Sequence, residues 1–362
     1  MNLDSQPRDA AQRFLVEGQV TAVDPIGDGL IHRSYHITTT SPDGALREYV
    51  LQDINTEVFK HPEILMRNVE RVLTQLQRAE KANGSWHRLE LVPVAGTTAQ
   101  WLRLGGRAWR MYRLIEGSRT LRKVTAETEA EQIGAAFGRF LRQIEPLPEA
   151  ELEDALPGYR DTENYYAEFL AAASADVLER RMVARKLEGG FLQHAGLAHR
   201  LAQQVRAGEL PTRPLHGDTK FNNVLFDAAG SQAICVIDLD TVMIGPVAKD
   251  FGDCYRSILL EHPEDRVLPD EGLRLFGAMT QGFARMLRGV LERAEVQSLV
   301  AGVQTLLFEN GIRFLADYFR GDTYFHTAYP TQNLDRAARH LQALERVSSQ
   351  VQEMEKLVRQ IW

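Results

Sequence analysis

The chain has 362 residues, with 42 lysine and arginine residues against 49 aspartate and glutamate residues, and a net charge of −7 at pH 7. Its hydrophobic content of 44% supports one large or two modest domains, and its acidic balance argues against a nucleic-acid partner. Two cysteines form no disulfide or zinc pattern and no apolar leader or membrane span is seen, so we expect a cytoplasmic protein without membrane contact.

The first part of the chain predicts strands at 20–23, 34–40 and 47–54. A turn containing Gly27 and Gly29 joins the first two of them. Glycines in such a loop let the backbone approach a phosphate closely, although an ordinary hairpin turn uses glycine in the same way. Gly27 and Gly29 are therefore candidate nucleotide-binding residues, with a simple turn as the alternative.

A helix is predicted from Pro62 to about residue 82, because apolar residues recur there at helical spacing. Strand-rich runs follow at 86–95 and 98–115. The second run ends just before Glu116-Gly117, where a hinge between two lobes would lie. The backbone groups of Met111, Tyr112 and Arg113 could pair there with an adenine edge, and the same residues would also suit an ordinary central strand.

The remainder of the chain predicts mainly helices, near 125–145, 161–174, 177–207, 270–291, 294–320 and 333–361. Together these elements predict an α+β, two-lobed, protein-kinase-like fold. Its N-terminal lobe, 1–114, would be an antiparallel β-sheet with one helix that binds the nucleotide. Its C-terminal lobe, 115–362, would be mainly helical and carry the catalytic and substrate-binding residues.

The segment 215–240 carries the most specific pattern. Asp218 follows His216 and Gly217, Asn223 comes five residues later, and Asp238 a further fifteen. Phosphoryl transfer requires an acceptor held in line and neutralised phosphate oxygens. We expect Asp218 to orient the acceptor hydroxyl and take its proton, and Asn223 and Asp238 to hold Mg²⁺ on the phosphates of ATP, because Mg²⁺ prefers oxygen ligands.

A hairpin would bring these side chains together. The apolar run 224–226, the turn at 227–231 and the β-branched strand 233–237 return Asp238 toward Asn223 and Asp218. His216 is expected to brace the loop through hydrogen bonds rather than to act chemically. Each residue alone is equally consistent with an acid or amide facing water, so the prediction depends on the combination.

A second triplet competes for the metal role. Asp250-Phe251-Gly252 spells the magnesium-binding triplet of protein kinases, but it begins 27 residues after Asn223 and beyond the predicted hairpin. Asp238 fits the short hairpin better. Asp250 is expected to support the following helix or the catalytic loop through backbone hydrogen bonds.

With these residues in place, the chain resembles the aminoglycoside phosphotransferase and choline kinase-like superfamily, and within it most closely the bacterial N-acetylhexosamine 1-kinases. The segments that carry the nearer resemblance are 51–55, 58–59, 219–220, 222–223, 237–243, 250–253, 308–318 and 321–325. The resemblance implies Asp218 as the base, Asn223 and Asp238 as metal ligands, and ATP and Mg²⁺ as cofactors. It further implies transfer to the anomeric hydroxyl of GlcNAc or GalNAc.

The resemblance also implies that Arg313 and Tyr324 contact the sugar. From the residues alone, Arg313 lies in an apolar helix and would need a carboxylate or a ligand as a partner. A structural salt bridge therefore remains an alternative for Arg313, and simple packing remains one for Tyr324. The sequence leaves the oligomeric state open.

One departure concerns the strand lysine that pairs with the nucleotide phosphates in protein kinases. Gln52 stands about where that lysine would be. A non-catalytic nucleotide-binding module is therefore one alternative. The other keeps the fold and changes the acceptor to an aminoglycoside, a choline-like amino alcohol or homoserine, whose charge Glu151, Glu153, Asp154 and Asp161 could attract.

Overall fold

The computed structural model describes residues 6–26, 31–80, 86–260 and 269–362. After α1 (Gln6–Ala11), five strands form an antiparallel sheet in the order β1-β2-β3-β5-β4. Their bounds are Gln19–Ile26, Arg33–Thr40, Leu46–Ile54, Arg107–Arg113 and Trp101–Leu104, respectively. The predicted strands at 20–23, 34–40 and 47–54 are confirmed. The turn with Gly27 and Gly29 lies outside the described residues.

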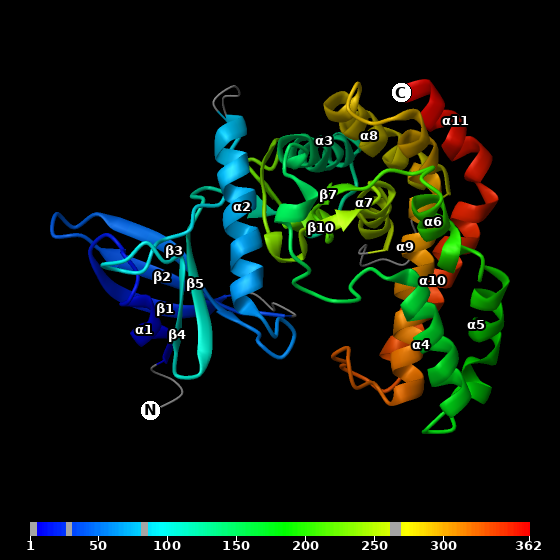
Figure 1. Ribbon diagram of the computed structural model, residues 1–362, viewed down its shortest axis with the longest axis horizontal. Coiled ribbons are helices and arrows are strands. Elements are labelled where there is room, and N and C mark those ends of the chain that lie inside the picture. The colour runs from blue at the N-terminus through cyan, green and yellow to red at the C-terminus, as the bar shows by residue number, and fades with distance from the viewer. Residues whose placement is uncertain (1–5, 27–30, 81–85, 261–268) are drawn as a thin grey trace.

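The sheet has two different faces because successive residues of a strand point to opposite sides. Tyr49 and Leu51 of β3 lie over a small core with Trp109 and Met111 of β5. The alternate positions, Gln52 of β3 and Arg110 of β5 among them, lie on the opposite face. Figure 1 shows the helix α2 (Pro62–Glu80) standing between the sheet and the helical lobe.

The helical lobe is built around α9 (Arg293–Arg320), whose buried residues lie on all of its sides. A helix that is apolar all round is stable only when other elements surround it. The packing helices are α4 (Thr162–Ala175), α5 (Arg181–Gln193), α6 (Leu197–Arg206), α7 (Ala248–Leu260), α10 (Gln332–Ser349) and α11 (Val351–Ile361). A second layer is formed by α3 (Glu127–Ile144) and α8 (Pro269–Leu287). The predicted two-lobed fold is confirmed.

Four local predictions were wrong. The run 86–95 forms isolated bridges instead of a strand, and Pro93 within it has no N–H to donate. The helix predicted over 177–207 is interrupted at 194–196, where the hydrogen bonds tighten to i→i−3. The helix predicted over 333–361 breaks at Gln350. The helix expected to follow Asp250-Phe251-Gly252 begins earlier, at Ala248, so this triplet lies inside α7.

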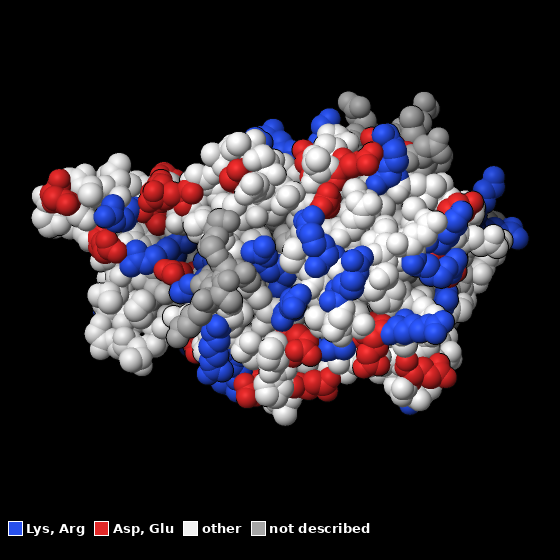
Figure 2. All heavy atoms as spheres, turned by 90° about the horizontal axis from the view of Figure 1, so that it is seen from above, with Lys and Arg blue, Asp and Glu red and all other residues white. Residues whose placement is uncertain are grey.

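Basic and acidic side chains lie side by side over the face shown in Figure 2. Among the described residues, no helix is long and apolar enough to cross a membrane.

Candidate active site

The segment 216–238 forms the predicted hairpin. β8 (Val224–Phe226) pairs with β9 (Ala233–Val236) and with β6 (Arg119–Thr120), and the turn at 227–230 connects β8 to β9. Just beyond the paired strands, the Ile237 amide donates to the Asn223 carbonyl over 2.9 Å. This bond holds the start of the loop that carries Asp238 directly beside Asn223.

The loop that precedes the hairpin is held by Asp250. Its two carboxylate oxygens accept the backbone N–H groups of His216 and Gly217 at 2.7 and 2.9 Å. Burial raises the pKa of Asp250 to about 6, although these two hydrogen bonds favour the ionised form. The predicted hydrogen bonds from the loop to Asp250 are thus confirmed. The position of Asp250 in α7 also explains why Gly252 follows it. A Cβ on Gly252 would lie 2.4 Å from the Gly302 backbone, so Gly252 lets α7 approach α9.

His216 braces the loop in the expected manner. Its Nδ1 accepts the Asp218 amide at 3.3 Å, so Nε2 carries the proton and donates to the Ile237 carbonyl at 2.9 Å. The ring packs edge-on against Phe137 and Phe140. Gly217 has φ 82°, and a Cβ there would lie 2.2 Å from the Thr241 carbonyl oxygen, so only glycine fits this position.

Asp218 is 8% exposed and stands among polar partners. The Asn223 side-chain nitrogen donates to two oxygens of Asp218, the backbone carbonyl at 2.8 Å and Oδ2 at 3.1 Å. The Lys220 ammonium lies 3.0 Å from Oδ1. Burial would lower the pKa of Lys220, but the carboxylates of Asp218 and Asp253 outweigh it and raise the pKa, so the side chain is a cation beside the carboxylate.

Asp238 follows the hairpin in a left-handed conformation, with φ 64°. The residue as a whole is exposed to solvent, while partial burial of its carboxyl group disfavours the charged form. This partial desolvation, together with the negative charges of Asp240 and Asp218, raises the pKa of Asp238 to about 7. A divalent cation would relieve that repulsion, and the Asn223 nitrogen that faces Asp218 leaves its amide oxygen as a ligand. The donor set therefore fits Mg²⁺.

Within the described ranges, no three His, Cys, Asp or Glu side chains gather into a metal site. The set formed by Asn223 and Asp238 is of another kind, because one ligand is an amide and the remaining positions on Mg²⁺ are commonly filled by water and phosphate oxygens.

The structure contains a buried ion pair near Asp238 that was not predicted from the sequence. The Arg110 guanidinium from β5 forms two parallel bonds to Asp240, at 2.5 and 2.6 Å, and its Nε donates to Gln52 at 2.9 Å. His32 Nε2 lies 2.5 Å from Asp240, and His32 Nδ1 accepts the Asn55 amide. Burial alone would raise the pKa of Asp240, but Arg110 and His32 hold it below its usual range. An arginine inside the apolar run 108–112 was the available signal.

A second missed cluster surrounds Arg160, which is 4% exposed and has φ 59°. Its Nη2 lies 2.6 Å from Asp253, its Nη1 lies 3.2 Å from Glu309, and its Nε donates to the Gly217 carbonyl. The same guanidinium comes within 3.9 Å of Asp218. Arg160 therefore connects the loop of Gly217 and Asp218 to α7, which carries Asp253, and to α9, which carries Glu309.

Arg313 and Tyr324 lie together, in an aromatic setting. The Arg313 guanidinium is 4.5 Å from the Tyr165 ring, 5.9 Å from Tyr324 and 5.5 Å from Phe325. Tyr165 also accepts a hydrogen bond from the Arg160 amide, which ties this group to the catalytic loop. No salt bridge of Arg313 is found in the described part of the chain, so the anticipated carboxylate partner is replaced by rings. Tyr324 is 68% exposed.

The predicted hinge residues lie at the end of β5. The Met111 carbonyl accepts the Val92 amide, and the Arg113 amide donates to Glu90. The Arg113 side chain pairs with Glu17 at 2.9 Å, and the Tyr112 side chain is buried. These backbone groups are engaged with the segment 90–92, and contact of Met111, Tyr112 or Arg113 with adenine stays a prediction.

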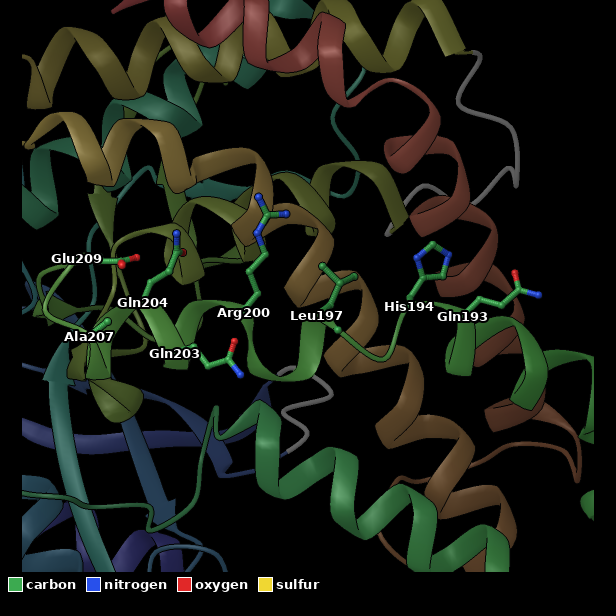
Figure 3. Close-up of a pocket in the computed structure, with 9 residues that line it drawn as sticks. Gln193, His194, Leu197, Arg200, Gln203, Gln204, Ala207 and Glu209 are labelled. Atoms are coloured by element: carbon green, nitrogen blue, oxygen red, sulfur yellow. The ribbon is translucent and has the colours of Figure 1, made fainter.

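A surface depression of about 670 Å³ lies away from these residues. Its lining comes from the end of α5, from α6 and from the turn after α6, as Figure 3 shows. Arg200 on its wall contacts Gln304 of α9. The depression contains none of the predicted site residues.

Comparison with known proteins decides the family. A sequence profile described as the phosphotransferase enzyme family matches residues 22–287, which include most of the five-stranded sheet, the helices from α2 to α8 and the whole hairpin. The chain belongs to this family. The resemblance to the aminoglycoside phosphotransferase superfamily is thereby confirmed, and the protein is a phosphotransferase in which Asp218, Asn223 and Asp238 lie within the matched region.

Solved structures share the fold of this phosphotransferase. An aminoglycoside phosphotransferase from Alicyclobacillus acidocaldarius is 14% identical with a TM-score of 0.61, covering 98% of this chain and 96% of its own. An amicoumacin kinase solved with AMP-PNP and Ca²⁺ is 13% identical with a TM-score of 0.63, covering 95% and 93%. A spectinomycin phosphotransferase solved with ADP and spectinomycin is 12% identical with a TM-score of 0.59, covering 97% and 99%.

Proposed function

We propose that this phosphotransferase is an ATP- and Mg²⁺-dependent small-molecule kinase that phosphorylates the anomeric hydroxyl of an N-acetylhexosamine, giving the sugar 1-phosphate and ADP. The observation that carries the proposal is the joining of Asp218, Asn223 and Asp238 through the hairpin, in a chain of this family. The nucleotide would lie between an N-terminal lobe, 1–114, and a C-terminal lobe, 115–362.

The chemistry assigns one task to each residue. Asp218 accepts the proton of the anomeric hydroxyl as its oxygen attacks the γ-phosphorus, and the bond to the β,γ-bridging oxygen breaks to release ADP. The Lys220 ammonium, 3.0 Å from Asp218, lies where it can offset negative charge on the transferring group. Mg²⁺, when bound by Asn223 and Asp238, would supply neutralisation of the phosphate oxygens.

The surroundings of Arg313 support a neutral acceptor. Aromatic rings at Tyr165, Tyr324 and Phe325 offer apolar faces for a sugar, and the Arg313 guanidinium offers donors for its hydroxyl and acetamido oxygens.

Three of the four acidic residues considered for a cationic acceptor, Glu153, Asp154 and Asp161, have other partners. Glu153 binds Arg67 and Arg71, and its hydrogen bond to Arg67 is the main reason that its pKa is lowered to about 2. Asp154 accepts the Leu156 amide, and Asp161 caps α4 by accepting the Asn164 amide. An aminoglycoside, choline-like amino alcohol or homoserine therefore has less support than a sugar.

The test is ADP release from Mg-ATP with GlcNAc, GalNAc, glucose, galactose, kanamycin, choline and homoserine as acceptors. We expect turnover with an N-acetylhexosamine and an acid-labile phosphate at its anomeric carbon. Turnover with kanamycin, choline or homoserine alone would refute the sugar assignment while keeping the kinase. Nucleotide binding without turnover of any acceptor would favour the non-catalytic alternative.

Paired variants separate chemistry from folding. Asp218→Asn and Asn223→Ala should abolish ADP release while the circular dichroism spectrum is kept. Asn222→Ala, at the exposed position beside Asn223, should retain activity within about twofold. For the acceptor side, Arg313→Lys should raise the KM for the sugar about tenfold or more and leave the KM for ATP unchanged.

A further inference from the structure

The N-terminal lobe holds a row of polar side chains that crosses three strands. Ser34 pairs with Gln52 across β2 and β3, and Gln52 pairs with Arg110 across β3 and β5. Cross-strand partners lie on the same face of a sheet. Gln52 donates to Ser34 at 3.2 Å and accepts from Arg110 Nε at 2.9 Å. The row thus ends in a guanidinium on the face opposite the small core of Tyr49 and Trp109.

The position in this row where kinases carry the strand lysine is occupied by the neutral Gln52. The positive charge is displaced by one strand, to Arg110, and Gln52 orients it. Because the arginine side chain is longer than that of lysine, a guanidinium on the neighbouring strand can serve the same volume. The Arg110 head is 2% exposed and lies beside Asp240, two residues after Asp238.

We propose that Arg110 supplies the cation that binds the nucleotide phosphates, in place of a β3 lysine, with Asp240 holding it when no nucleotide is bound. This inference rests on the proposed function, since it requires a nucleotide beside Asp238. A guanidinium presents five N–H donors in a planar fork that matches phosphate oxygens. The bonds to Asp240 and Gln52 use three of them, and another Nη1 donor faces only the Met66 thioether at 4.0 Å, a weak acceptor.

Among the side chains of α2 that the structure describes, no acid is found paired with Arg110. The side chain that α2 places at the guanidinium is Met66. Glu63 of α2 binds His61 and lies 3.5 Å from Arg103. The partner carboxylate of Arg110, Asp240, instead comes from the C-terminal lobe. The same cation can therefore contact both the nucleotide and the loop that carries Asp238.

The decisive experiment measures nucleotide binding, separately from turnover. Titration calorimetry with AMP-PNP and Mg²⁺, and with adenosine, is performed on the wild type, on Arg110→Gln and on the charge swap Gln52→Lys/Arg110→Gln. We expect Arg110→Gln to weaken AMP-PNP binding about 100-fold and to leave adenosine binding unchanged, because only the phosphates lose a partner. The swap, which returns the cation to β3, should recover at least a tenfold part of that loss.

Two further variants guard against a purely structural explanation. Arg107→Met removes another arginine of β5 that pairs with an aspartate of β3, Asp53, at 2.6 Å, and should leave AMP-PNP binding unchanged. Arg110→Lys keeps the charge without the fork and should weaken AMP-PNP binding about tenfold. If Arg110→Gln fails to fold, the swap and Arg110→Lys carry the test.

The outcomes separate the two proposals. Unchanged AMP-PNP binding by Arg110→Gln, equal losses for AMP-PNP and adenosine, or a folded swap with no recovery would each overturn the role of Arg110. A wild-type protein that binds neither AMP-PNP nor ATP would overturn the proposed function, and the role of Arg110 with it.

Discussion

Arg110 and Arg160 are both buried arginines paired with aspartate, but their surroundings differ. Arg160 lies among two carboxylates, Asp253 and Glu309, and a backbone carbonyl. Those carboxylates have further partners of their own, Arg256 at 2.7 Å from Asp253 and Thr162 at 2.7 Å from Glu309. Arg110 has one carboxylate, Asp240, which also contacts His32, and one amide, Gln52.

The comparison separates charges that stabilise the fold from charges kept for a ligand. Every charged member of the Arg160 cluster is buried and hydrogen-bonded within the C-terminal lobe. Asp238, in contrast, is exposed to solvent, and its carboxylate is repelled by those of Asp240 and Asp218. Such repulsion costs stability unless a cation binds, and this is the condition expected of a metal and nucleotide site.

Breaking the Arg160 cluster should have the largest effect. Arg160→Met leaves Asp253 and Glu309 buried without their shared cation, so we expect a loss of about 3–5 kcal/mol in the free energy of unfolding. Urea denaturation measures it. Arg206→Met, which breaks an exposed pair with Glu163, should cost below about 1 kcal/mol. Similar values for the two variants would contradict the structural role of Arg160.

Asp238→Asn should have the opposite effect from Arg160→Met, because it should reduce activity without reducing stability. It should reduce kcat at least a thousandfold, about 4 kcal/mol of barrier, because a metal ligand is lost, while the midpoint of thermal unfolding is unchanged or raised. Steady-state ADP release and a melting curve provide both values. Asp43→Asn, in an exposed turn, serves as the control and should match the wild type. Full activity of Asp238→Asn would exclude Asp238 as a ligand.

A smaller change tests how much one hydrogen bond in the Arg160 cluster contributes to stability. Thr162→Val keeps the shape of the side chain and removes its hydrogen bond to Glu309, so we expect a loss of about 2 kcal/mol in unfolding free energy without a change in KM for ATP. Thr120→Val, at an exposed position of β6, should change stability by less than about 0.5 kcal/mol. A raised KM for ATP in Thr162→Val would assign this cluster to the nucleotide instead.

The smallest effect is a pH dependence. The pKa of Asp238 is about 7 in the folded protein and about 3.9 in an unfolded chain. The folded state therefore holds the proton more tightly, and this contribution to stability is present below pH 4 and is lost as the pH rises toward 7. Because the side chain meets solvent, we expect a difference below about 1 kcal/mol.

Thermal unfolding of the wild type and Asp238→Asn from pH 4 to 7 measures this difference. Relative to the wild type, Asp238→Asn should become more stable as the pH rises, and MgCl₂ should remove the difference by stabilising only the wild type. A difference that is independent of pH and of Mg²⁺ would show that Asp238 carries no raised pKa.

Much of the site was predictable because it is local. His216, Asp218, Asn223 and Asp238 lie on one short hairpin, whose turn residues and β-branched strand determine where each side chain returns. Arg313 and Tyr324 are also close in the chain. The supporting hydrogen bonds of Asp250 could be expected, but its place in a helix could not, since Gly252 has a packing role that only α9 explains.

The order of the lobes, the amphipathic helices and the hairpin of β8 and β9 could be predicted from the residues, because each follows from periodicity or from spacing over a few residues. The partners of the buried arginines, in contrast, are known only from the packed fold. Arg110 and Asp240 are 130 residues apart, and Arg160 and Glu309 are 149 residues apart. Which distant carboxylate neutralises a buried cation depends on how helices and strands pack, and local spacing contains no record of that packing.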